Sequence, residues 1–210
     1  MPLIKLFQPL KNCSIGIWKI QENLSELIQL SENLYEKELL ETSNTERKKQ
    51  RIISRLLLAK MLDVSSVSIS YDENRKPFIK VQNCFFSISH TSEFVVVSLS
   101  SEKNTGVDIE KLTNRILRIE SRFISNHDAK ILDSFIDKLE AKYLVWGAKE
   151  CMLKYVGDRK IDFKKHMQLK SFNFTDKGAF KAELNYERIH EEFEINYLRI
   201  EDHILTYIFK

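Results

Sequence analysis

The order of the hydrophobic patterns along the chain constrains its fold more than any other feature of the sequence. Short apolar or alternating runs predict strands, and longer runs with a 3.6-residue period predict helices. In the first half a strand precedes two helices and a strand meander, and the second half repeats this order about 90 residues later. We therefore predict two fused α+β subdomains, divided near residues 101–105 into residues 1–103 and 104–210.

The individual elements follow from the same patterns. In the first half the predicted strands are 15–20, 67–71, 78–81, 84–89 and 94–99, and the predicted helices are 24–40 and 46–62. In the second half the predicted strands are 106–111, 168–174, 179–185, 193–200 and 203–209, and the predicted helices are 127–136 and 140–155. The sequence contains no low-complexity tract or long linker, so we expect the halves to pack closely.

Composition excludes several classes of protein. The chain is 43% hydrophobic and 30% charged, which is typical of a globular protein, and no apolar run approaches the roughly 18 residues of a membrane-spanning helix. The first residues lack the charged-then-apolar layout of a secretion signal, so we expect a cytoplasmic protein. Three widely spaced cysteines indicate neither a disulfide framework nor a cysteine zinc site.

Phosphate binding, if present, must use side chains and helix ends. The five glycines form neither a GxGxxG nor a Walker A motif. The net charge of +3 permits an acidic partner without requiring nucleic acid.

The predicted strand 106–111 carries two acids. Val107 and Ile109 would point into a core, so Asp108 and Glu110 would share the opposite face. Two carboxylates on neighbouring same-face positions can hold one hard divalent cation, and Mg²⁺ typically takes one or two carboxylates together with substrate phosphates. The alternative is a pair of polar positions on a half-exposed strand.

The predicted helix 140–155 carries a third acid and a lysine. Glu150 and Lys154 are one turn apart and lie off the apolar stripe, where they could meet the acids of the strand. Cys151 belongs to the stripe, so we expect a buried, inert thiol. The apolar stripe consists of Leu144, Ala148, Cys151, Met152 and Tyr155.

Three further segments could bind phosphate. The strand Phe86-Ser87-Ile88-Ser89-His90-Thr91 ends in hydroxyls and an imidazole, which can donate hydrogen bonds to phosphate oxygens. The alternative is an ordinary turn with a capping serine and a surface histidine. The helix 46–62 carries Arg47, Arg51 and Arg55 at steps of four, and guanidinium groups bind phosphate bidentately. The alternative there is a solvated helix face, and Arg75-Lys76-Pro77 alone reads as a basic hairpin turn.

The combination of Asp108-x-Glu110 with Lys149-Glu150-x-x-x-Lys154 resembles the signature of the Sfp-type 4'-phosphopantetheinyl transferases. The resemblance covers most of the chain, and its pieces occur in the family's order and spacing. They are Arg75-Lys76-Pro77, 86–91, 106–110, Arg122-Phe123 and 146–154. The sequence departs from the common pattern at Arg75 and Ser92, where the family often has glycine, and after Lys154, where only Gly157 remains of a glycine-richer loop.

The resemblance implies a fused α+β pseudo-dimer with one active site between its halves. It implies coenzyme A as donor, Mg²⁺ as cofactor, and a serine of an acidic acyl or peptidyl carrier protein as acceptor, in fatty acid, polyketide or nonribosomal peptide biosynthesis. The protein would act as a monomer, without nucleic acid or membrane. The N-terminal half would contact the coenzyme A phosphates, and the C-terminal half would carry the metal site and the catalytic helix.

The resemblance also implies a role for each candidate residue. Asp108, Glu110 and Glu150 would hold the metal, and the catalytic groups would be Glu150 as general base, Lys154 and His90. The coenzyme A contacts would come from Arg47, Arg51, Arg55, Arg75, Lys76, Pro77, Ser89, His90, Thr91, Asp108 and Lys154. The rival hypotheses are another Mg²⁺-dependent phosphotransfer or phosphodiester-cleaving enzyme, a nucleic-acid-binding module built on helix 46–62, and a catalytically inactive carrier-binding protein.

Overall fold

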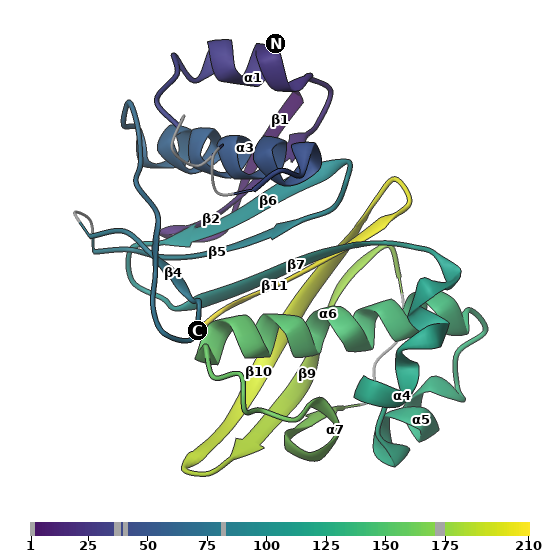
Figure 1. Ribbon diagram of the computed structural model, residues 1–210. Coiled ribbons are helices and arrows are strands. Elements are labelled where there is room, and N and C mark those ends of the chain that lie inside the picture. Colours follow the sequence, from purple (N-terminus) through teal and green to yellow (C-terminus); the bar gives the residue numbers. More distant parts are fainter. Residues whose placement is uncertain (1–2, 36–38, 40–41, 81–82, 171–174) are drawn as a thin grey trace. The chain divides into compact units, whose positions relative to one another are not determined.

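Each half of the chain folds around its own antiparallel sheet and its own hydrophobic core (Figure 1). The computed structural model describes residues 3–35, 39, 42–80, 83–170 and 175–210. The chain separates into two units, Met1–Asn104 and Thr105–Lys210. The predicted α+β class is confirmed, whereas the pseudo-dimer arrangement stays a prediction.

The first unit contains a four-stranded sheet in the order β1-β2-β6-β5. The long helix α3 packs on β2 and β6, and α1 packs on α3. Ile52, Ile53 and Leu57 of α3 are fully buried in this core. The elements are β1 (Leu3–Leu10), β2 (Cys13–Lys19), α1 (Leu24–Leu30), α3 (Thr45–Leu62), β3 (Ser70–Tyr71), β4 (Pro77–Phe78), β5 (Phe85–His90) and β6 (Phe94–Ser100).

The second unit contains a five-stranded sheet in the order β7-β11-β10-β9-β8, and α6 packs along β7 and β11 (Figure 1). The elements are β7 (Thr105–Lys111), the 3-10 helix η1 (Asn114–Arg118), α4 (Glu120–Phe123), α5 (Asn126–Leu132), α6 (Lys138–Val156), α7 (Phe163–His166), β8 (Met167–Leu169), β9 (Lys177–Tyr186), β10 (Ile189–Ile200) and β11 (His203–Phe209).

The two units share one order of connections. In the first unit β2 leads into helices, in the second unit β7 does, and in each unit the last strand pairs antiparallel with that strand. The pairs are β2 with β6 and β7 with β11.

Several element boundaries differ from the prediction. The helix predicted at 24–40 ends at Leu30, because Ser31 caps it and Glu32 and Asn33 adopt positive φ angles. The strand predicted at 67–71 is reduced to Ser70–Tyr71, and the helix predicted at 127–136 to Asn126–Leu132. Residues 36–38, 40, 81 and 171–174, which fall within predicted elements, lie outside the described residues.

Strand β1 was not predicted. Its sequence includes Pro9, and its pairing with β2 is irregular between Phe7 and Leu10. Proline is tolerated in strands at sheet edges and bulges, and β1 is an edge strand of its sheet. No helix within the described part of the chain has the length and apolar content needed to cross a membrane.

Candidate active site

Helix α6 lies directly against strands β7 and β11 because glycine occupies two contact positions. A Cβ atom on Gly106 of β7 would lie 2.1 Å from the carbonyl oxygen of Cys151, and one on Gly147 of α6 would lie 2.5 Å from the Thr206 hydroxyl oxygen of β11. A side chain at either position would force the helix and the sheet apart. These glycines therefore place the polar residues of α6 within reach of those of β7.

Asp108 and Glu110 lie on the face of β7 that α6 covers, since they alternate with Gly106 along the strand. Val107 and Ile109 are buried as predicted. The two acids do lie on the face opposite Val107 and Ile109, but this face is not open to solvent, because α6 packs on it. Asp108 is only 4% exposed.

Lys154 connects the helix to the strand. Its ammonium donates hydrogen bonds to the Asp108 carboxylate (2.8 Å) and to the backbone carbonyl of Val107 (2.9 Å). The strand and helix motifs, which are separated by about 40 residues in sequence, are therefore joined at this ion pair.

Trp146 makes a second connection that the sequence did not indicate. Its indole N–H donates a hydrogen bond of 2.9 Å to the Glu110 carboxylate. The Trp146 ring also contacts the rings of Phe123 and Phe163 edge-on. The available signal was its position four residues before Glu150, which puts both side chains on one side of α6.

Three carboxylates and one ammonium interact electrostatically in this cluster. Burial and the neighbouring Asp108 carboxylate raise the pKa of Glu110 to about 7, and the same two causes raise the pKa of Glu150 to about 7. Burial acts to lower the pKa of Lys154, but the Asp108 and Glu150 carboxylates outweigh it and raise that pKa. We call Asp108, Glu110, Glu150 and Lys154 the acidic cluster.

The donor set of the acidic cluster fits a hard divalent cation. Its three carboxylates supply oxygen ligands, and burial together with repulsion from the Asp108 carboxylate raises the pKa of two of them. A cation would relieve this repulsion. Mg²⁺ prefers such oxygen ligands and binds through few carboxylates when substrate phosphates complete its coordination.

Two neighbouring residues of α6 have different environments. Cys151 is fully buried, which confirms the predicted burial of its thiol, and burial raises the pKa of that thiol. Lys149 is also fully buried, which the apolar stripe did not predict. Leu144, Ala148 and Met152 of that stripe are fully buried, as predicted.

In the first unit, Ser89, His90 and Thr91 lie at the end of β5. Ser89 is buried and His90 is exposed. The Thr91 hydroxyl accepts hydrogen bonds from the backbone N–H groups of Glu93 (3.2 Å) and Phe94 (3.1 Å), so it caps the turn into β6. The alternative interpretation of this segment was an ordinary turn capped by a serine hydroxyl, and the Thr91 hydroxyl has this capping role.

Helix α3 approaches the same turn through Gln50, whose side-chain amide donates a hydrogen bond of 2.9 Å to the Thr91 carbonyl. Arg47 is exposed and Arg51 is half-buried, but Arg55 is only 4% exposed. The Arg55 guanidinium donates a hydrogen bond to the Arg51 carbonyl and lies 5.9 Å from the centre of the Tyr35 ring. Arg55 therefore does not belong to a solvated helix face, which was the alternative interpretation of this segment.

The Arg75-Lys76-Pro77 segment forms the turn between β3 and β4. Arg75 has a φ of 63°, in the left-handed region that favours glycine, which accounts for the glycine that is common at this position in the resembled family. The Lys76 ammonium donates a hydrogen bond of 3.3 Å to the Asn104 side chain, and burial lowers the pKa of Lys76. Pro77 begins β4.

Known proteins resemble the second unit most clearly. The sequence model of the 4'-phosphopantetheinyl transferase superfamily matches residues 104–208, a range that contains the whole acidic cluster. A curated 4'-phosphopantetheinyl transferase of Bacillus subtilis is 30% identical over 99 residues, which cover 46% of this chain and 44% of that protein. The alignment therefore spans less than half of that relative's length.

Proposed function

The chain belongs to the 4'-phosphopantetheinyl transferase superfamily, and we propose that it transfers 4'-phosphopantetheine from coenzyme A to a serine of an acyl or peptidyl carrier protein, with Mg²⁺ as cofactor. The observation that carries this proposal is the acidic cluster. It combines three carboxylates from β7 and α6 with a lysine that is hydrogen-bonded to Asp108 at 2.8 Å. This set fits a cation-assisted reaction at a phosphate.

Asp108, Glu110 and Glu150 would hold the Mg²⁺ ion. When bound, the ion would polarise the phosphoryl oxygens and offset the negative charge that develops on them. The Lys154–Asp108 hydrogen bond supports this assignment, because it fixes the position of the Asp108 carboxylate and keeps the negative charge of that carboxylate within the acidic cluster. Lys154 would also contribute positive charge near the coenzyme A phosphates.

Glu150 would act as the general base. The serine hydroxyl would give its proton to the Glu150 carboxylate while the serine oxygen forms a bond to the β-phosphorus of coenzyme A. The bond from that phosphorus to the leaving phosphate oxygen would break, and 3',5'-ADP would depart. A pKa of about 7 favours this role, because a general base works best when its pKa is near the operating pH.

The first unit would supply phosphate contacts for coenzyme A. Exposed His90 at the end of β5 and exposed Arg47 at the start of α3 are our leading candidates, with Lys76 at the β3–β4 turn. The 3'-phosphate contact would come from Arg47 or Arg51, because Arg55 is buried against Tyr35. Ser89, Thr91, Arg75 and Pro77 would shape these contacts through the backbone of their turns.

An intact-mass assay tests the proposal. The protein is incubated with coenzyme A, Mg²⁺ and either an apo-acyl or an apo-peptidyl carrier protein, and the carrier is weighed. We expect the carrier to gain one phosphopantetheine group at its serine, and we expect no gain with a serine-to-alanine carrier, with excess EDTA, or with Asp108→Asn. A panel of apo-carriers that stays unmodified with the wild-type protein would refute the transfer.

A further inference from the structure

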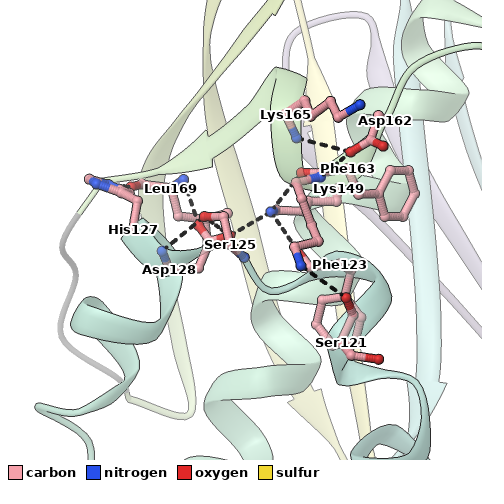
Figure 2. A network of polar contacts seen from close by, with 11 residues as sticks. Ser121, Phe123, Ser125, His127, Asp128, Lys149, Asp162, Phe163, Lys165 and Leu169 are labelled. Carbon is pink, nitrogen blue, oxygen red and sulfur yellow. Dashed lines mark hydrogen bonds and ion pairs between the residues drawn. The ribbon is translucent and has the colours of Figure 1, made fainter.

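Lys149 is a buried charge in the second unit whose hydrogen bonds all go to separate segments of the chain. Its side chain is completely buried. Its ammonium donates hydrogen bonds to the Asp128 carboxylate (2.6 Å) and to the backbone carbonyls of Phe123 (2.7 Å) and Phe163 (2.8 Å). These three acceptors match the three hydrogens of an ammonium group, and Figure 2 shows them converging on it.

Asp128 is held in place independently of Lys149. The same carboxylate oxygen accepts hydrogen bonds from the backbone N–H (2.9 Å) and the hydroxyl (2.8 Å) of Ser125, at the start of α5. Its other oxygen lies 3.4 Å from the backbone nitrogen of Leu169 in β8. Lys149 therefore joins α6 to a carboxylate that α5 and β8 already fix.

The two backbone acceptors of Lys149 belong to the residues whose rings contact Trp146. The Phe123 ring lies edge-on to the indole with centroids 5.1 Å apart, and the Phe163 ring does so at 5.6 Å. Phe123 ends α4 and Phe163 begins α7, so each ring comes from a separate short helix. By holding both carbonyls, Lys149 fixes both rings around Trp146.

Trp146 in turn holds Glu110 through the 2.9 Å hydrogen bond from its indole N–H. A continuous set of contacts thus leads from a fully buried ammonium to one carboxylate of the acidic cluster. Every residue in this set lies in Thr105–Lys210.

We propose that Lys149 is a positioning residue, which clamps Phe123 and Phe163 around Trp146 and thereby fixes Glu110 for metal binding. The metal part of this inference rests on the proposed function, whereas the clamp on Trp146 does not. Residues that orient metal ligands in this indirect way typically change metal affinity or activity by about 10–100-fold when they are replaced. We expect an effect of that size on the Mg²⁺ dissociation constant.

Trp146 provides a direct readout of the clamp. The chain has two tryptophans, and Trp18 belongs to the core of the first unit, so a Trp18→Phe background leaves Trp146 as the reporter. In this background, emission wavelength and fluorescence anisotropy are measured, and Mg²⁺ alone is titrated at neutral pH. We expect Lys149→Met to shift Trp146 emission to longer wavelength, to lower its anisotropy, and to raise the Mg²⁺ dissociation constant about 10-fold or more.

A paired substitution separates positioning from stability. Lys149→Met leaves the Asp128 charge buried without its partner, which lowers stability. Lys149→Met with Asp128→Asn removes that charge but keeps a side-chain oxygen for Ser125. We expect the double variant to recover midpoint temperature relative to Lys149→Met while Trp146 emission and Mg²⁺ affinity stay altered. If midpoint temperature, Trp146 emission and Mg²⁺ affinity all recover in the double variant, the proposal is overturned, because the role of Lys149 is then purely structural.

Two further variants complete the test. Lys142→Met removes an ion pair with Glu120 (2.5 Å), which also joins α6 to α4 but includes neither an aromatic ring nor a Lys149 acceptor. We expect wild-type Trp146 emission and Mg²⁺ affinity from this control. Phe163→Leu keeps the Lys149 hydrogen bonds and removes one ring, so it tests the clamp even if Lys149→Met fails to fold. Unchanged Trp146 emission and Mg²⁺ affinity in Phe163→Leu would refute the clamp.

The two proposals fail in different ways. If the wild-type protein shows no Mg²⁺ response, the metal assignment under the proposed function is wrong. Trp146 emission and anisotropy in Lys149→Met and Phe163→Leu then still decide whether the clamp exists.

Discussion

Glu150 differs from the other two acids of the cluster because it is carried by the helix rather than by the strand. Asp108 is hydrogen-bonded to Lys154 and Glu110 to Trp146, and burial and the Asp108 charge raise the pKa of both Glu110 and Glu150 to about 7. A carboxylate that is easily protonated near neutral pH suits proton transfer.

We predict that Glu150→Gln lowers turnover by about 10²–10⁴-fold, the usual contribution of a general base, since the amide cannot accept the serine proton. Initial rates of carrier modification at saturating coenzyme A and Mg²⁺ measure this effect. Cys151→Ala, the adjacent buried position, should keep wild-type turnover and cost about 1 kcal/mol of stability. If Glu150→Gln keeps wild-type turnover, Glu150 is not the general base.

The arginines of α3 should divide into two functional classes by their burial. Arg47→Ala or Arg51→Ala should weaken coenzyme A more than 3'-dephospho-coenzyme A, because a phosphate contact is lost. Arg55→Ala should instead lower stability by about 1–3 kcal/mol, since Arg55 is buried against Tyr35. Donor binding by calorimetry and urea denaturation separate the two outcomes. If all three variants discriminate between coenzyme A and 3'-dephospho-coenzyme A as the wild type does, the assignment of the 3'-phosphate contact to α3 is contradicted.

At the scale of elements, the acidic cluster depends on how closely α6 packs on β7. The helix begins at the Asp137 cap, ends at Gly157 in the left-handed conformation, and presents Glu150 and Lys154 one turn apart. The absence of a side chain at Gly106 sets the distance between the helix and the strand. The same distance determines whether Lys154 reaches Asp108.

We predict that Gly106→Ala destabilises the protein by about 1–3 kcal/mol and also removes most Mg²⁺ binding, because the new methyl group would displace the Cys151 backbone. The control is Gly178→Ala in β9, where a Cβ atom would meet the Tyr197 hydroxyl at 2.7 Å, a side-chain contact rather than a backbone contact with α6. Thermal denaturation and Mg²⁺ titration are the measurements. If Gly106→Ala binds Mg²⁺ as Gly178→Ala does, the close packing does not position the acidic cluster.

At the scale of the whole molecule, the acidic cluster opposes folding at neutral pH when no cation is bound. Glu110 and Glu150 have pKa values near 7 in the folded protein, above the ordinary value of 4.5. Between these values the folded protein binds more protons than the unfolded chain. The free energy of unfolding therefore falls as pH rises from about 4.5 to 7.

We predict that Mg²⁺ stabilises the protein more at pH 8 than at pH 5, because protonated carboxyls do not bind the ion. At a concentration of about 100 times the dissociation constant, Mg²⁺ should add about 2.7 kcal/mol at pH 8. Urea denaturation followed by circular dichroism, with Mg²⁺ or with EDTA, measures this at both pH values. In Glu110→Gln the EDTA-treated protein should lose less stability between pH 5 and pH 8 than the wild type. Equal stabilisation by Mg²⁺ at both pH values would place its binding elsewhere.

The sequence by itself predicted most of the long helices and strands and brought the residues of the acidic cluster together as candidates. Strand β11 lies at the predicted residues, and α6 is within two residues of its prediction at each end, because long hydrophobic periods are local signals. The four-residue spacing of Glu150 and Lys154 also indicated that the two side chains lie on one side of their helix. The edge strand β1 was not predicted, because its sequence includes Pro9. The early end of α1 was not predicted either, because the positive φ angles at Glu32 and Asn33 stop the helix although the apolar pattern continues.

Only the tertiary structure decided which face of β7 receives α6, and so whether the acids lie beneath the helix or away from it. It also decided that Arg55 and Lys149, which look solvated in sequence, are buried. The burial of a charged side chain depends on acceptors from distant segments, and for Lys149 these come from residues 14 to 26 positions away. Local periodicity cannot supply such partners, because they meet only when the chain has folded.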